Sequence, residues 1–157
     1  MSKRDTYRQL TAELTSLLEG ERDWVANAAN TAALLYEHMD DLNWIGFYFL
    51  RGAELIVGPF QGRPACVRIA LGKGVCGTAV ARRETIVVPD VHAFPGHIAC
   101  DAASNSEIVV PLFEGEQVIG VLDADSPEFG RFDDDDRLGL EEIARLFVRA
   151  TDLKWRI

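Results

Sequence analysis

The stretch from residue 58 to residue 111 constrains this chain more than any other. It contains all three cysteines and two of the three histidines, among glycines and prolines that interrupt regular structure. Cysteine and histidine serve more often for their reactivity than for their volume, so this stretch is poorly suited to fill a core. We therefore interpret it as the functional face, and the segments on either side as its scaffold.

The charge of the chain argues against several classes of partner. Sixteen Lys and Arg residues stand against twenty-five Asp and Glu residues, a formal net charge of -9. Such a chain has no general attraction to phosphate backbones or anionic lipid, so we expect neither nucleic acid nor a membrane as a partner. The first ten residues lack an apolar signal segment, and no run of about 18 apolar residues follows. We therefore expect a cytoplasmic protein.

The segments outside the functional stretch predict regular elements. Residues 22–39 carry apolar side chains at helical spacing, Val25 and Tyr36 among them, and residues 44–50 are apolar on both parities, as in a strand covered on both faces. The predicted helices are 4–19, 22–39, 75–82 and 132–151, and the predicted strands are 44–50, 54–58, 67–70, 85–88, 107–113 and 117–123. Residues 90–106 are expected to form a loop with one helical turn after Cys100.

This order of elements predicts one α+β domain over the 157 residues. A central antiparallel sheet of about six strands would have helices packed on one face. The other face would be left for the loops rich in Gly, Pro and Cys. A pocket roofed by those loops is the expected site.

Two metal hypotheses fit the sequence poorly. Zinc would have to use Cys66, Cys76, Cys100, His92 and His97, but these residues lack the spacing of known zinc sites. The run of four aspartates at 133–136 lacks the Gly and Glu positions of a calcium loop. We expect instead that Asp133 caps the last helix, and we predict neither a metal centre nor a cofactor.

Thiol chemistry is the remaining chemical hypothesis. Three cysteines, an odd number, suit a reducing compartment better than a structural disulfide framework. Cys76 lies where the turn at 72–74 enters a helix, whose N-terminus can stabilise a thiolate. Cys100 lies in a polar loop near His97, and Cys66 begins a strand near two arginines. His92 and His97 are candidate acid-base groups, although loop histidines more often only cap or solvate.

Four segments together resemble the free methionine-(R)-sulfoxide reductase family, whose members have the GAF fold. They are GPFQGRPACVRI, GKGVCGTA, DVHAFPGHIACD and SNSEIVVPL, and WIGFYFL and VIGVLD resemble strands of GAF domains in general. The resemblance covers about residues 20–150. It implies a single GAF domain over residues 1–157, with a six-stranded antiparallel sheet, and a homodimer as a common assembly.

The resemblance also implies roles for particular residues. Cys100 would attack the sulfoxide sulfur and become a sulfenic acid, Cys66 would resolve it as a disulfide, and Cys76 would be an alternative or relay thiol. Thioredoxin or an equivalent dithiol would restore the reduced enzyme. Substrate-binding roles would fall to three carboxylates that hold the ammonium group and to an aromatic pocket for the S-methyl group: Glu107, Asp123 and Asp125, and Trp44 and Tyr48.

The residue pattern agrees with part of this assignment. Asp123 and Asp125 share parity at the end of one strand and point to the same face, whereas the face of Glu107 depends on the register of its hairpin. Trp44 and Tyr48 also share parity, but plain core packing would produce the same pattern. We expect a reductase of free methionine-(R)-sulfoxide. The alternative is a non-catalytic GAF module that binds a small ligand or senses redox state. For such a module we would expect a linker that joins it to an effector domain.

Overall fold

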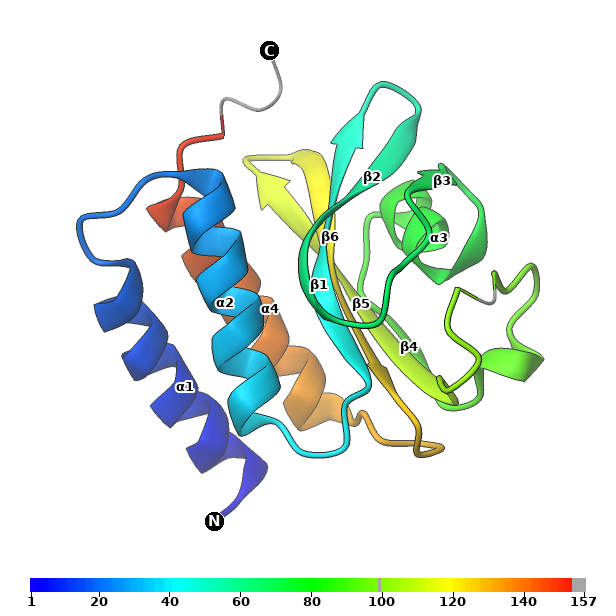
Figure 1. Ribbon diagram of the computed structural model, residues 1–157, viewed down its shortest axis with the longest axis horizontal. Coiled ribbons are helices and arrows are strands. Elements are labelled where there is room, and N and C mark those ends of the chain that lie inside the picture. Colours follow the sequence, from blue (N-terminus) through cyan, green and yellow to red (C-terminus); the bar gives the residue numbers. More distant parts are fainter. Residues whose placement is uncertain (99, 154–157) are drawn as a thin grey trace.

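The computed structural model describes residues 1–98 and 100–153 (Figure 1). The helices are α1 (Lys3–Leu18), α2 (Trp24–His38), α3 (Gly74–Arg82) and α4 (Asp134–Ala150), with a short 3-10 helix η1 at Val91–Ala93. The strands are β1 (Trp44–Arg51), β2 (Glu54–Gly62), β3 (Arg68–Ala70), β4 (Ile86–Val88), β5 (Ser106–Glu114) and β6 (Gln117–Ser126). None of the described helices is both long and apolar enough to cross a membrane.

The six strands form one antiparallel sheet in the order β3-β2-β1-β6-β5-β4. The two central strands are β1 and β6, which lie far apart in sequence. They pair along their length, from Trp44 opposite Asp125 to Phe49 opposite Gly120. The strand at residues 44–50 is therefore central, as its apolar pattern on both parities predicts.

Three helices cover one face of the sheet (Figure 1). The odd-numbered side chains of β1, Ile45, Phe47 and Phe49, pack against α2 and α4 in a core that also includes Phe147. Helix α1 lies outside α2 and α4 and completes this layer. Burial of these large apolar side chains supplies most of the stabilisation of the fold.

The opposite face carries α3 together with the loops that contain the cysteines. Even-numbered side chains of β1 project here, and Val75, Cys76 and Ala79 of α3 pack against the same face. The α+β fold with a six-stranded antiparallel sheet is confirmed, and α3 is the one α-helix of the described chain that lies on the loop side.

Several local expectations are corrected by the structure. The helical turn predicted after Cys100 lies before it instead, in η1, where the Asp90 side chain accepts from the His92 N–H. Val25 and Tyr36 are partly exposed, because the buried stripe of α2 is narrower than its apolar pattern suggests. Asp133 caps α4 as predicted, in a capping box with Asp136.

Candidate active site

A row of polar side chains crosses the loop-side face of the sheet. Glu107 of β5 lies opposite Asp125 of β6, and Asp125 in turn lies opposite Trp44 of β1. Asp123 lies two residues from Asp125, on the same face. The register therefore places Glu107 on the face shared by the two aspartates, which strand parity alone left open.

The pKa values of all three carboxyl groups are raised, first by burial and then by the charge of a neighbouring carboxyl group. Burial raises the pKa of Glu107 well above its usual range, and the nearby Asp123 adds to the effect. Burial and the charge of Asp125 raise the pKa of Asp123 to about 8. The pKa of Asp125 is raised by burial and by Glu107. A cation placed among these groups would remove this repulsion, so the cluster is a suitable site for an ammonium group.

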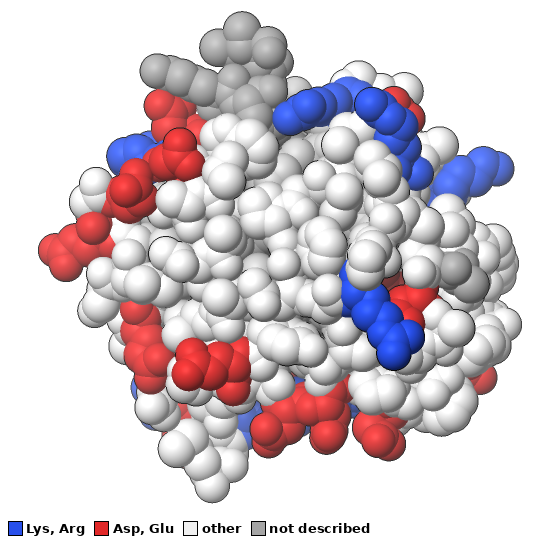
Figure 2. Space-filling model, in the orientation of Figure 1, with Lys and Arg blue, Asp and Glu red and all other residues white. Residues whose placement is uncertain are grey.

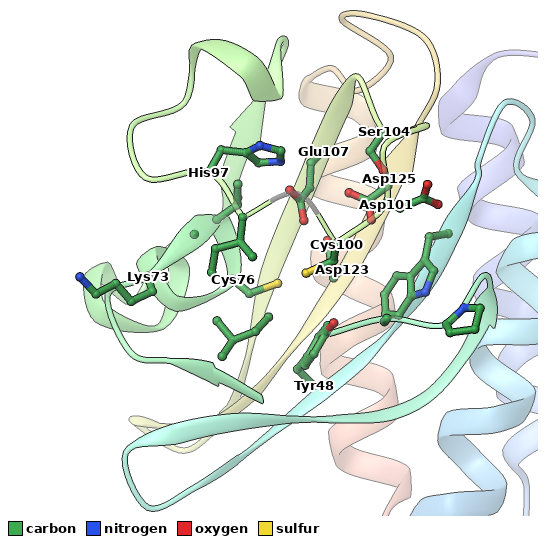
Figure 3. Close-up of a pocket in the computed structure, with 17 residues that line it drawn as sticks. Tyr48, Lys73, Cys76, His97, Cys100, Asp101, Ser104, Glu107, Asp123 and Asp125 are labelled. Atoms are coloured by element: carbon green, nitrogen blue, oxygen red, sulfur yellow. The ribbon is translucent and has the colours of Figure 1, made fainter. Parts of the chain in front are cut away.

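Cys76 extends the acidic cluster from the α3 side (Figure 3). Its side chain is buried, and burial together with the negative charge of Asp123 raises the pKa of its thiol. The helix N-terminus was expected to stabilise a thiolate, but burial and the surrounding carboxyl groups outweigh it, so Cys76 is held as a neutral thiol. One ligand atom from each of Cys76, Glu107 and Asp123 lies within 4.8 Å of the others, a donor set for a metal ion or for an ammonium group.

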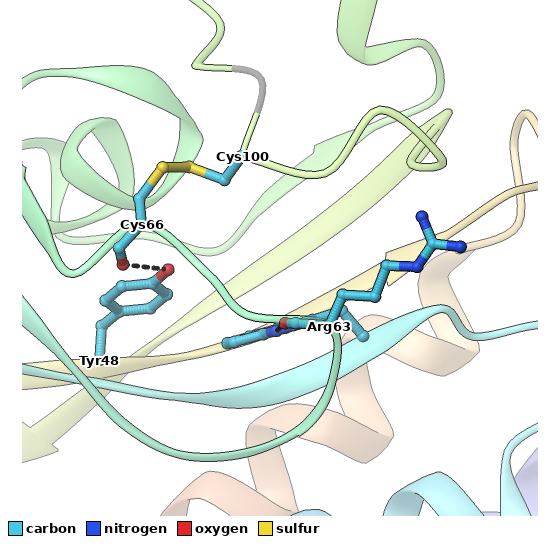
Figure 4. The surroundings of a disulfide bond; sticks show 5 residues. Tyr48, Arg63, Cys66 and Cys100 are labelled. Carbon is cyan, nitrogen blue, oxygen red and sulfur yellow. Dashed lines mark hydrogen bonds between the residues drawn. A yellow bond between two sulfur atoms is a disulfide. The ribbon is translucent and has the colours of Figure 1, made fainter.

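The other two cysteines form a disulfide at the edge of the same cavity (Figure 4). Cys66 and Cys100 are 34 residues apart in sequence, and their Cα atoms lie 5.5 Å apart. Cys66 belongs to the loop between β2 and β3, and Cys100 to the loop between η1 and β5. The disulfide thus joins two loops that reach the cavity from opposite edges of the sheet.

Trp44 and Tyr48 form the aromatic wall of the cavity. Both are almost fully buried, and their rings stack with centroids 5.8 Å apart. Their polar tips have partners: Trp44 Nε1–H donates to the Arg63 carbonyl, and the Tyr48 hydroxyl donates to the Cys66 carbonyl, each at 3.1 Å. Burial raises the pKa of Tyr48, so its hydroxyl keeps its proton and remains a donor.

The cavity has a volume of about 50 Å³. Seven of the eight predicted site residues line it, and the eighth, Cys66, is bonded to one of the seven. The lining consists of Trp44, Tyr48, Pro64, Ala65, Ile69, Lys73, Gly74, Val75, Cys76, His97, Ile98, Cys100, Asp101, Ser104, Glu107, Asp123 and Asp125. In Figure 3 the carboxyl group of Glu107 points toward the sulfur atoms of Cys76 and Cys100, whereas the ammonium group of Lys73 points away.

A small polar network holds the loop that follows Cys100, and sequence reasoning did not find it. The Asn43 side-chain amide donates to Asp101 and to Ser104, each at 3.0 Å. Asp101 also accepts from the Ala103 N–H, which closes a local turn. The Asp-x-x-Ser spacing was the available signal, because Asp and Ser side chains favour such turns.

The two loop histidines have different surroundings. His97 lines the cavity, and burial with the nearby His92 lowers its pKa. His92 is exposed, with Asp90 3.0 Å from its Nδ1 and the ring of Phe129 beside it. The structure therefore brings only His97 of this pair to the cavity.

Negative charge is gathered at the site as well as over the surface. Figure 2 shows Asp and Glu atoms set back in a hollow on the right of the view, beside a Lys or Arg side chain. The middle of the same view is covered by uncharged residues.

Comparisons with known proteins agree with this fold. The family model described as GAF domain matches residues 12–152. The free methionine-R-sulfoxide reductase of Escherichia coli is 56% identical over 91% of this chain and 87% of its own length. The solved structure of the free methionine-R-sulfoxide reductase of Neisseria meningitidis in complex with its substrate is 48% identical, with a TM-score of 0.92 over 96% of this chain and 90% of that chain. The Staphylococcus aureus protein fRMsr, in complex with substrate, is 53% identical, with a TM-score of 0.88 over 92% and 94% of the two chains.

These matches define the chain as a member of the GAF domain family. Its sheet, its cavity on the loop side and the extent of the matched region agree with that class. Within it, the chain belongs to the family of free methionine-R-sulfoxide reductases.

Proposed function

We propose that this protein reduces free L-methionine-(R)-sulfoxide to L-methionine, with Cys100 as the nucleophile. The observation that carries the proposal is the Cys66–Cys100 disulfide at the edge of a cavity that also contains Glu107, Asp123 and Asp125. One small substrate could then react with the thiol pair at its sulfoxide group and bind the carboxyl groups through its ammonium group. The activity of relatives over most of this chain supports the same substrate.

The first step is the attack of the Cys100 thiolate on the sulfoxide sulfur. The oxygen passes from the sulfoxide to the sulfur of Cys100, and one proton is taken up. The products are methionine and a sulfenic acid on Cys100. A group that can protonate the oxygen must lie nearby. In the enzyme without substrate Asp123, with its pKa of about 8, still carries a proton near neutral pH, and the arrival of the substrate's ammonium group favours release of that proton to the oxygen.

The second step regenerates a stable enzyme. The Cys66 thiol attacks the sulfenic acid sulfur, a disulfide forms, and the oxygen leaves as water. A dithiol of the thioredoxin class then reduces the disulfide to two thiols. Such reductants belong to the cytoplasm, where we place the protein.

The cluster of carboxyl groups explains a preference for the free amino acid. A buried anionic cluster gains most from a ligand that carries a full positive charge, and the α-ammonium group of free methionine sulfoxide supplies it. A methionine inside a peptide has an uncharged amide at that position. The stacked rings of Trp44 and Tyr48 provide an apolar wall for the S-methyl group.

We also propose that the protein forms a homodimer. Light scattering of the purified protein tests this.

The test is a turnover assay with separated R and S sulfoxides of free methionine and with thioredoxin as reductant. We expect turnover of the R form alone. Cys100→Ser should abolish even the first turnover, whereas Cys66→Ser should still produce one methionine per chain. Multiple turnovers by Cys100→Ser would reassign the nucleophile. A disulfide that forms and is reduced without production of methionine would favour a redox-sensing GAF module instead.

A further inference from the structure

The loop that carries Cys66 crosses the aromatic wall of the cavity. Residues 63–67 connect β2 to β3, and the Val57 N–H donates to the Val67 carbonyl at the far end of the loop. Cys66 itself is held by its disulfide to Cys100. That bond is absent whenever the enzyme is ready to react, so other contacts must then keep Cys66 within reach.

Two side chains of the central strand supply such contacts (Figure 4). Trp44 and Tyr48 rise from the same face of β1, and their donors meet the Arg63 and Cys66 carbonyls near the two ends of the loop. Both side chains are at most 3% exposed, and Trp44 also stacks on Phe60 of β2 with ring centroids 5.1 Å apart. Side chains packed in this way have few alternative rotamers, so their donors are fixed relative to the sheet.

We propose that the Tyr48 hydroxyl is a positioning group for the resolving cysteine. It holds the backbone of Cys66 so that the thiol stays close to Cys100 in the reduced enzyme. The inference rests on the proposed function and adds a second role to a ring that already forms the wall for the S-methyl group. Its effect should fall on closure of the disulfide, the step that protects the sulfenic acid of Cys100 from further oxidation.

The experiment is a single turnover of Tyr48→Phe, which keeps the ring and removes only the hydroxyl. Fully reduced protein is mixed with methionine-(R)-sulfoxide without reductant. Methionine is measured against time, and samples are quenched with a carbon nucleophile that traps sulfenic acids. Mass spectrometry then counts trapped, disulfide and over-oxidised chains. Tyr36→Phe is the matched control, because Tyr36 is a partly exposed tyrosine of α2. Cys66→Ser defines the signal in the absence of the Cys66–Cys100 disulfide.

We expect closure of the disulfide to slow about five- to tenfold in Tyr48→Phe, the effect of one lost hydrogen bond. The rate of the first methionine should fall by less, and Tyr36→Phe should match the wild type. Equal slowing of both steps would assign Tyr48 to the substrate wall alone and overturn the inference, as would unchanged closure. If wild-type protein forms no methionine, the proposed function itself fails, an outcome distinct from both.

Discussion

Glu107 and Asp125 lie directly opposite each other on β5 and β6, two carboxyl groups that face one cavity. Like charges at such positions repel each other, because the side chains of a cross-strand pair lie only about 5 Å apart. With Asp123 beside them and Cys76 above, the site concentrates groups that prefer to be neutral until a cation arrives. The carboxyl groups that we propose to bind the ammonium group therefore lower the free energy of unfolding of the protein without substrate.

The first prediction concerns stability against pH in the oxidised protein. Because the pKa of Asp123 is raised from 3.8 to about 8, the folded state binds a proton that the unfolded state has lost over this range. The free energy of unfolding should therefore fall as pH rises from 4 to 8, by up to about 5 kcal/mol for this group. Asp123→Asn should be more stable than the wild type at pH 8 and differ little at pH 4. Thermal unfolding at several pH values measures this, with Asp40→Asn as a control at an exposed aspartate.

The second prediction concerns the charge of the substrate. N-acetylation of methionine sulfoxide removes the ammonium group that we assign to the cluster of carboxyl groups. We expect kcat/KM to fall about a hundredfold, the effect of lost hydrogen bonds to charged groups. The methyl ester, which keeps the ammonium group, should be affected much less by this cluster. Equal kcat/KM values for the acetylated and free substrates would contradict the assignment.

The third prediction concerns the reactivity of the three thiols. In the oxidised native protein Cys76 should resist alkylation, because its thiol is buried and its pKa is raised. After mild reduction, Cys66 and Cys100 should be labelled well before Cys76. Mass spectrometry of labelled protein counts the adducts, and denatured reduced protein should show three. Rapid labelling of Cys76 in the oxidised protein would show that the site opens far more than its packing indicates.

The fourth prediction concerns Gly62, where β2 passes over Trp44. The backbone there has φ of +135°, and an added Cβ would lie 2.6 Å from Trp44 Cδ1 and 2.7 Å from the Asn43 carbonyl oxygen. Gly62→Ala should lower the free energy of unfolding by about 2 to 4 kcal/mol through strain and displaced packing. Gly52→Ala is the control, because Gly52 also has a positive φ but no heavy atom within 4 Å of the added Cβ. Its loss should be about 1 kcal/mol, and urea unfolding compares the two.

The strands and helices could be predicted because their patterns are local. The alternation of Ile45 and Phe47 with Trp44 and Tyr48 is visible in the sequence and corresponds to the two faces of β1. The face of Glu107 could not be predicted in the same way, since it depends on pairing across a hairpin whose register shifts between Leu112 and Phe113. One residue of slip would have moved its carboxyl group to the helix side.

The chemistry of the cysteines was less accessible to sequence reasoning. No periodicity connects Cys66 to Cys100, which meet only because two loops converge over the sheet, and their pairing came from family resemblance. The position of Cys76 at a helix start suggested a stabilised thiolate. Burial outweighs this effect, together with carboxyl groups of β5 and β6 that lie more than 30 residues further along the chain.

The covalent link between Cys66 and Cys100 also closes a long loop in the chain. A cross-link over 34 residues restricts the unfolded ensemble enough to stabilise a fold by about 4 kcal/mol in the chain-entropy model. Each catalytic cycle would thus switch the protein between a reduced form without the cross-link and an oxidised form that is more stable against unfolding. When the reductant is scarce, the oxidised form with the disulfide would accumulate. This inactive form would also be the one that resists heat and proteolysis better.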